Sequence, residues 1–134
     1  MLKIESHIAD VRINLMAGSL EDLFSEGVKG LYAVLRPIGE NKNQVSGLSV
    51  HLNGPDKTIL LIDFLNEVLS HSLVNRCVYK EFTSFHLQGN ILKASISGYK
   101  IRSFTIEVKA VTFHEAEILN TYTGMLQTTI ILDI

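Results

Sequence analysis

Residues 107–118, EVKAVTFHEAEI, combine strand-forming side chains with an unusual density of charge. Valine and phenylalanine at positions 108, 111 and 113 favour β-structure. Charged and histidine side chains alternate with them, at Glu107, Lys109, His114, Glu115 and Glu117. So much valine and phenylalanine predicts a strand well inside a sheet, whose charges emerge where the sheet meets solvent or a functional site. The alternative is an ordinary amphipathic strand with a solvated polar side.

The alternation of this stretch breaks once. The apolar residues from Phe104 to Ala110 fall at even positions, whereas Val111 and Phe113 fall at odd positions. A β-bulge at Ala110 and Val111 would return both sets to one core face, and bulges often re-aim side chains beside active sites. We therefore expect a bulged strand here.

The overall composition is that of a folded protein with one domain. The chain has 134 residues, which suit a single core over residues 1–134. Hydrophobic residues make up 46% and charged residues 19%, which argues against disorder. The net charge is −2 and no run of basic residues is present, which argues against a broad nucleic-acid-binding surface. Contact with RNA through a partner protein stays open.

Signals for targeting or covalent cross-linking are weak. Cys77 is the only cysteine, which excludes an internal disulfide and favours a reducing compartment. The first residues, MLKIESHIADVRI, lack the apolar core of a signal peptide. The longest apolar stretch, residues 59–65, contains Asp63 and is too short to cross a bilayer. We expect a cytoplasmic protein that has no contact with membranes.

Two stretches show helical periodicity. The first follows Ser19, a good N-cap, and ends before Pro37. The second is residues 58–74, TILLIDFLNEVLSHSLV, with Thr58 as its cap. Strands are predicted at residues 2–16, 45–53, 78–87, 91–97, 107–118 and 125–134.

The order of these elements predicts an α+β fold, in which two amphipathic helices pack on a largely antiparallel or mixed β-sheet. Residues 78–87 and 91–97 form a hairpin, followed by a loop at residues 98–103. The almost continuous apolar run of residues 125–134 indicates a central strand covered on both faces. The two halves of the chain are alike in element order, which suggests an internal structural duplication, although no residues repeat.

Common catalytic motifs are missing from the sequence. It contains no G-x-S-x-G, no P-loop, no G-x-G-x-x-G and no H-E-x-x-H. The acidic residues are more informative. Asp10 follows His7 by three residues, and Asp133 stands beside Ile134, whose α-carboxylate ends the sequence. Neighbouring carboxylates repel each other unless they are solvated or share a cation, and hard divalent ions prefer such oxygen ligands.

Four segments resemble the archease family in order and spacing. They are HIADVRI at 7–13, LLIDFLNEVL at 60–69, EVKAVTFHEAEI at 107–118 and LDI at 132–134. The resemblance implies a protein cofactor that is not itself an enzyme. Archeases assist the RtcB-type RNA ligase of tRNA splicing by promoting its guanylylation and multiple turnover. On this basis we expect the ligase as partner, contact with tRNA only through it, and a monomer or weak oligomer.

The resemblance also implies roles for individual residues. Asp10 and Asp133 match the family's metal-holding aspartates, with the carboxylate of Ile134 and the His7 side chain as further ligands. The metal is a divalent ion, Ca²⁺, Mg²⁺ or Mn²⁺. Residues expected to engage the partner stand in the third segment and are Lys109, His114 and Glu115.

The chain departs from the family pattern at two places. Arg12 stands where the family has a glycine, and residues 98–104 read only GYKIRSF, where many members carry a longer loop with a histidine. Two other functions are compatible with the residues. One is a metal-dependent hydrolase, in which the carboxylates and His114 activate a water. The other is a general chaperone or adaptor that acts independently of the ligase.

Overall fold

The computed structural model describes residues 10–112 and 116–134. Its two helices and its strands follow one another as β1 (Asp10–Ala17), α1 (Leu20–Leu35), β2 (Pro37–Ile38), β3 (Asn41–Asn53), α2 (Lys57–Asn75), β4 (Cys77–Gln88), β5 (Ile91–Lys100), β6 (Ser103–Phe104), β7 (Ala110–Thr112), β8 (Leu119–Asn120) and β9 (Leu126–Asp133).

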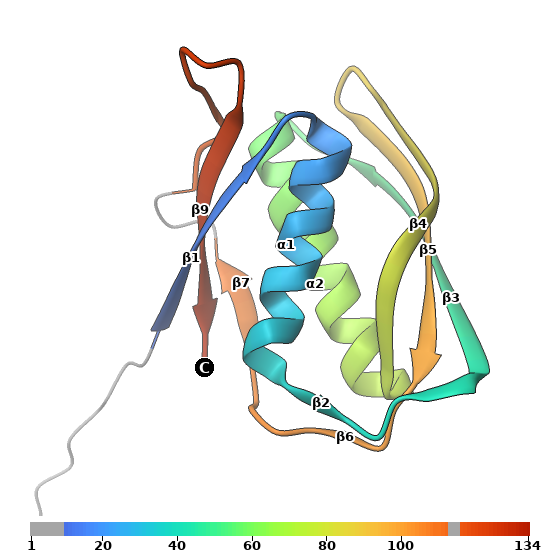
Figure 1. Ribbon diagram of the computed structural model, residues 1–134. Helices are drawn as coiled ribbons and strands as arrows, with labels where there is room; N and C mark the ends of the chain where they lie inside the picture. Colours follow the sequence, from blue (N-terminus) through green and yellow to red (C-terminus); the bar gives the residue numbers. More distant parts are fainter. Residues whose placement is uncertain (1–9, 113–115) are drawn as a thin grey trace, which may run out of the picture.

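The helices lie between two antiparallel sheets (Figure 1). One sheet has the order β3-β5-β4, and the other has the order β1-β9-β7 with β8 also paired to β9. The short strands β2 and β6 pair with each other at one end of the molecule. The predicted α+β class with two helices on antiparallel β-structure is confirmed. The strands are divided between the two faces of the helix pair instead of forming one sheet.

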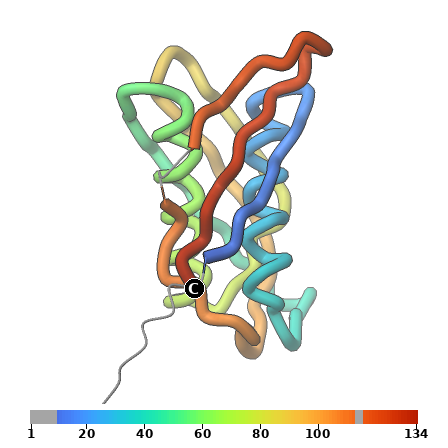
Figure 2. The backbone as a smooth tube through the Cα atoms, turned by 90° about the vertical axis from the view of Figure 1, so that its left-hand side faces the viewer, coloured from blue at the N-terminus to red at the C-terminus, as the bar shows by residue number. Residues whose placement is uncertain are grey.

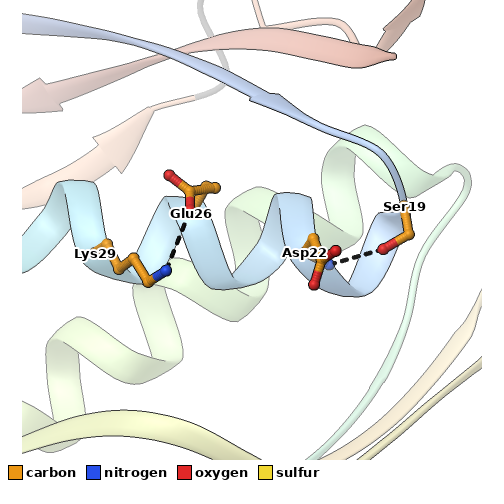
Figure 3. A network of polar contacts seen from close by, with 4 residues as sticks. All are labelled: Ser19, Asp22, Glu26 and Lys29. Carbon is orange, nitrogen blue, oxygen red and sulfur yellow. Dashed lines mark hydrogen bonds and ion pairs between the residues drawn. The ribbon is translucent and has the colours of Figure 1, made fainter. Parts of the chain in front are cut away.

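Helix α1 begins as the sequence predicts. The Ser19 hydroxyl accepts a hydrogen bond from the backbone nitrogen of Asp22 at 3.2 Å (Figure 3). The helix ends at Leu35, and Arg36 closes it in the left-handed conformation with φ 51°. Its apolar stripe is buried against β1 and β9 on one side and β4 on the other.

Helix α2 is capped by Asp56 and not by Thr58, which corrects the prediction. The Asp56 carboxylate accepts from the backbone nitrogen of Ile59 at 2.9 Å, while the Thr58 hydroxyl accepts from the backbone nitrogen of Ile118 at 3.0 Å. Apolar residues surround most of the helix because sheets cover it on two sides. Neither helix in the described part of the chain has the length and apolar character of a membrane span.

The predicted hairpin of β4 and β5 is present, with Gly89 at φ 60° in its turn. Strand β5 continues to Lys100, so the expected loop at 98–103 begins later than predicted. Gly98 lies within the strand, where a Cβ would collide with the carbonyl oxygen of Val78. Only glycine allows the two strands to approach so closely beside the irregular register that follows Tyr79.

Strand β9 lies in the middle of its sheet, as its apolar run predicts. It pairs with β1 on one edge and with β7 and β8 on the other. Ile130 and Leu132 are fully buried on the face towards the helices. Strand β1 shows the predicted alternation, with Asp10 and Arg12 exposed and Leu15 buried.

The stretch 107–118 differs from its prediction. Among its described residues, 107–112 and 116–118, Ala110–Thr112 form a strand, β7, which lies at an edge of the sheet. Its register with β9 is continuous, so the described residues contain no bulge at Ala110 and Val111. Val108 and Val111 are both buried because the backbone before Ala110 is not a strand, and alternation does not apply there.

Asn66 of α2 holds β7 in place. Its side-chain nitrogen donates to the carbonyl oxygen of Val111 at 2.8 Å, and its side-chain oxygen accepts from the Val111 backbone nitrogen at 2.8 Å. The amide thus satisfies both backbone groups of Val111, as a neighbouring strand would. This contact anchors the short edge strand to the core helix.

Replacing Asn66 by leucine should destabilise the protein by about 2–3 kcal/mol, because both partly buried polar groups of Val111 lose their partner. The variant Asn66→Asp keeps only the acceptor for the Val111 amide and sets a second carboxylate oxygen against the Val111 carbonyl oxygen, so it should be destabilised as well. Urea unfolding measures the free energy, and hydrogen exchange of the Val111 amide reports the local effect. Unfolding free energies equal to wild type in both variants would contradict the anchoring role.

Candidate functional site

The predicted metal ligands Asp10 and Asp133 lie directly opposite each other in the antiparallel pair of β1 and β9. Opposite residues share a face of the sheet and place their Cβ atoms about 4.5–5.5 Å apart. The alternation of β1 shows that this face turns away from the helices, since Leu15 on the other face is buried. Two carboxylates from the two ends of the chain therefore meet at the surface.

Lys109 joins the same end of the sheet. Its backbone nitrogen donates to the carbonyl oxygen of Asp133 at 2.7 Å, and the next residue, Ala110, is the register partner of Asp133. The Lys109 side chain is exposed. Figure 2 shows the start of β1, the end of β9 and the segment leading into β7 side by side. The structure thus brings together Asp10, Lys109 and Asp133, which the sequence analysis singled out.

The acidic pair is electrostatically unfavourable by itself. Like charges directly opposite each other in a sheet are destabilising, so the pair needs water or a cation. Asp10 is exposed and Asp133 is partly buried, which leaves one side open to solvent. Arg12 lies on the same face as Asp10, opposite Ile131, and places a guanidinium on the strand beside the pair. Of the described residues, this end of the sheet therefore carries the acidic side chains of Asp10 and Asp133 and the basic side chains of Arg12 and Lys109.

The described donors fit a hard divalent cation only as a partial ligand set. No group of three or more His, Cys, Asp or Glu side chains is gathered within residues 10–112 and 116–134. Mg²⁺ is commonly held by one or two carboxylates and keeps several waters, which matches Asp10 and Asp133. Ile134 follows Asp133 directly. The arrangement would leave coordination positions open to water or to groups of a partner.

Three predicted site residues lie outside the described part of the chain. They are His7, which precedes β1, and His114 and Glu115, which follow β7. The functions assigned to them stay predictions.

Sequence reasoning missed Asn66, which positions β7 and with it Lys109. The signal was a polar side chain in the otherwise apolar stretch LLIDFLNEVL. Asp63, in the same stretch, is also partly buried, and burial, together with repulsion from Glu67, raises the pKa of its carboxyl group. A polar residue at a buried position of an apolar helix indicates a hydrogen-bonding partner elsewhere in the fold, since buried polar groups are normally hydrogen-bonded.

Sequence comparison places the whole chain among known proteins. The model of the archease protein family matches residues 3–134. A protein archease from Methanosarcina barkeri is 27% identical over 129 residues, which cover 88% of this chain and 86% of that protein. A protein archease from Saccharolobus islandicus is 29% identical over 131 residues, covering 93% of each chain.

Solved structures agree in fold. A crystal structure from Thermotoga maritima, described as an archease and possible chaperone, has a TM-score of 0.74 at 19% identity and covers 100% of this chain and 98% of that one. A solution structure of a Methanobacterium thermoautotrophicum protein has a TM-score of 0.70 at 22% identity, covering 97% and 96%. The one functional description among these names, possible chaperone, belongs to the Thermotoga maritima protein. Because the family model spans nearly the full sequence, this chain belongs to the archease family.

Proposed function

We propose that this protein is a cofactor of an RtcB-type RNA ligase in cytoplasmic tRNA splicing, where it promotes guanylylation of the ligase and multiple turnover. Family membership supports the general assignment. The observation that carries the site is the register of β1 and β9, which pairs Asp10 with Asp133 beside Lys109. Contact with tRNA would occur only through the ligase.

In this proposal the two aspartates hold a divalent cation, Mg²⁺, Mn²⁺ or Ca²⁺, at the exposed end of the sheet. A bound cation would neutralise negative charge on phosphate groups at the ligase. The carboxylate of Ile134 and the side chain of His7 complete the protein's ligand set. Asp133 is fixed by its place in a central strand, so that it presents its carboxylate without further ordering of the backbone.

The Lys109 ammonium engages a phosphate or a carboxylate of the ligase in the same interface. Its backbone is fixed by the hydrogen bond to Asp133, while its side chain is exposed. A lysine is suited to this because its charge is compact and its stem is flexible. His114 and Glu115 would extend the interface along the segment after β7.

Ligase guanylylation with and without this protein tests the proposal. We expect Asp10→Asn and Asp133→Asn to reduce stimulation at least about tenfold, as loss of metal-site groups usually does, and Lys109→Gln to reduce it less. Glu107→Gln is the matched control, because Glu107 is exposed, acidic and close in sequence to Lys109. Full stimulation by Asp10→Asn and Asp133→Asn would rule out the proposed site.

Metal binding can be measured without the ligase. Titration with Mn²⁺ should broaden the amide resonances around Asp10 and Asp133 first, and Asp133→Asn should weaken binding by about tenfold or more. Arg12→Gln should strengthen binding, since it removes a positive charge from the same face of β1. Broadening centred elsewhere, or no change in Asp133→Asn, would argue against the aspartates as ligands.

A general chaperone or adaptor is the second candidate, because the related Thermotoga maritima protein is described as a possible chaperone. The two functions are separable by experiment. A general chaperone would suppress the aggregation of unrelated unfolded proteins, and the variants Asp10→Asn and Asp133→Asn would keep that effect. The hydrolase alternative has no comparable support from the relatives.

A further inference from the structure

A groove with a volume of about 610 Å³ lies between α1 and β4. Figure 1 places β4 on the other side of α1 from β1, so the groove is separate from the pair of Asp10 and Asp133. Its walls include Glu21, Asp22 and Tyr32 of α1 together with Glu81 and Phe82 of β4. A hollow of this size is within the range of pockets that bind small molecules or single side chains with their flanking backbone.

Two aromatic side chains give the groove a rigid apolar base. The Tyr32 hydroxyl accepts from the Tyr79 backbone nitrogen at 2.9 Å and hydrogen-bonds to Ser72 at 2.6 Å. Burial raises the pKa of Tyr32 to about 12, so its hydroxyl is neutral at ordinary pH. The ring of Phe82 stacks on Phe64 with centroids 5.6 Å apart. Both rings are only partly buried and keep some surface towards the groove.

The lysines at the groove are already paired with carboxylates. Lys29 lies 3.2 Å from Glu26, and Figure 3 shows its side chain extended along α1 towards that partner. Lys80 lies 2.8 Å from Glu40. Neither Glu26 nor Glu40 lines the groove. The positive charges of Lys29 and Lys80 are therefore paired with carboxylates outside the groove.

The groove carboxylates, in contrast, have no cationic partner. In the described part of the chain, no ion pair joins Glu21, Asp22 or Glu81 to a lysine, arginine or histidine. All three are exposed. Carboxylates gathered around a concave surface create a negative potential that attracts cationic groups and repels phosphate.

The position of Glu81 results from an irregularity in β4. The register with β5 shifts between Tyr79 and Glu81, so the strand has one residue more than its partner there. Lys80 and Glu81 are consequently both exposed, whereas regular alternation with one face on the core would bury one of them. The same irregularity, with the Tyr79 nitrogen bonded to Tyr32, hinders the addition of another strand along β4. Recognition at this groove would depend on side chains.

We propose that the groove between α1 and β4 binds a short basic segment of a partner protein. Lysine or arginine side chains of that segment would pair with Glu21, Asp22 and Glu81, and one apolar side chain would pack on Tyr32 and Phe82. This surface is additional to the ligase-activating site and does not require a metal ion.

A synthetic peptide tests the proposal on the full chain. The probe is acetyl-Gly-Arg-Lys-Leu-Lys-Arg-Gly-amide, and binding is followed by ¹⁵N NMR at low salt. We expect shift changes confined to α1 and to β4 around Glu81. The double variant Glu21→Gln, Glu81→Gln should weaken binding about threefold to tenfold, as expected from the loss of two exposed ion pairs.

Matched controls separate specific recognition from general attraction between opposite charges. The double variant Glu107→Gln, Glu117→Gln removes the same charge outside the groove and should leave the affinity unchanged. Replacing the peptide leucine by glycine should weaken binding, since the aromatic base then has no partner. The absence of peptide binding, equal weakening in both double variants, an unchanged affinity of the glycine peptide, or preferential binding of a single-stranded oligonucleotide in the groove would each overturn the proposal.

Discussion

The pairing of β1 with β9 is the interaction on which the rest of the molecule depends. It joins distant segments of the chain, and Thr129, for example, donates a hydrogen bond to Asn14, which lies 115 residues earlier. Closing so long a loop costs chain entropy, which burial of Ile130 and Leu132 helps to offset. A slip of one residue would turn these apolar side chains to the outer face and Asp133 towards the helices. Core burial and the acidic pair therefore require the same register.

The second sheet explains the character of α2. A helix packed on one sheet needs a single apolar stripe, but α2 also has neighbours on its other side. Leu60, Leu61 and Ile62 are consecutive and all fully buried, which one stripe does not permit. The few polar residues of such a helix need internal partners, and Asn66 has one in Val111. A polar contact thus connects the core helix to the edge strand that follows Lys109.

The sequence predicted those features that depend on contacts between residues close together in the chain. Ser19 caps α1 through a contact only three residues away, and the alternation of β1 follows directly from its apolar side chains. The edge position of β7 was not predictable from Val111, because the burial of this residue comes from packing on α2. The cap of α2 was also not predictable from local sequence. The Thr58 hydroxyl accepts a hydrogen bond from the backbone nitrogen of Ile118, which is 60 residues distant, so it does not cap the helix. Asp10 and Asp133 were identifiable from family motifs, but only the sheet register makes them neighbours.

The acidic pair of Asp10 and Asp133 and the groove between α1 and β4, to which we assign binding, both depart from the pattern of a regular sheet. Asn14 and Thr129, further along β1 and β9, form a favourable hydrogen-bonded pair, whereas Asp10 and Asp133 on the same face repel each other. On β4, Lys80 and Glu81 are exposed in succession where alternation would bury one of them. Neither the opposed carboxylates nor the two consecutive exposed residues of β4 stabilise the fold. Local departures from regular structure are expected where a protein binds a ligand or partner. In the first case a cation would remove the repulsion, and in the second a basic segment would neutralise the carboxylate that the irregular strand exposes.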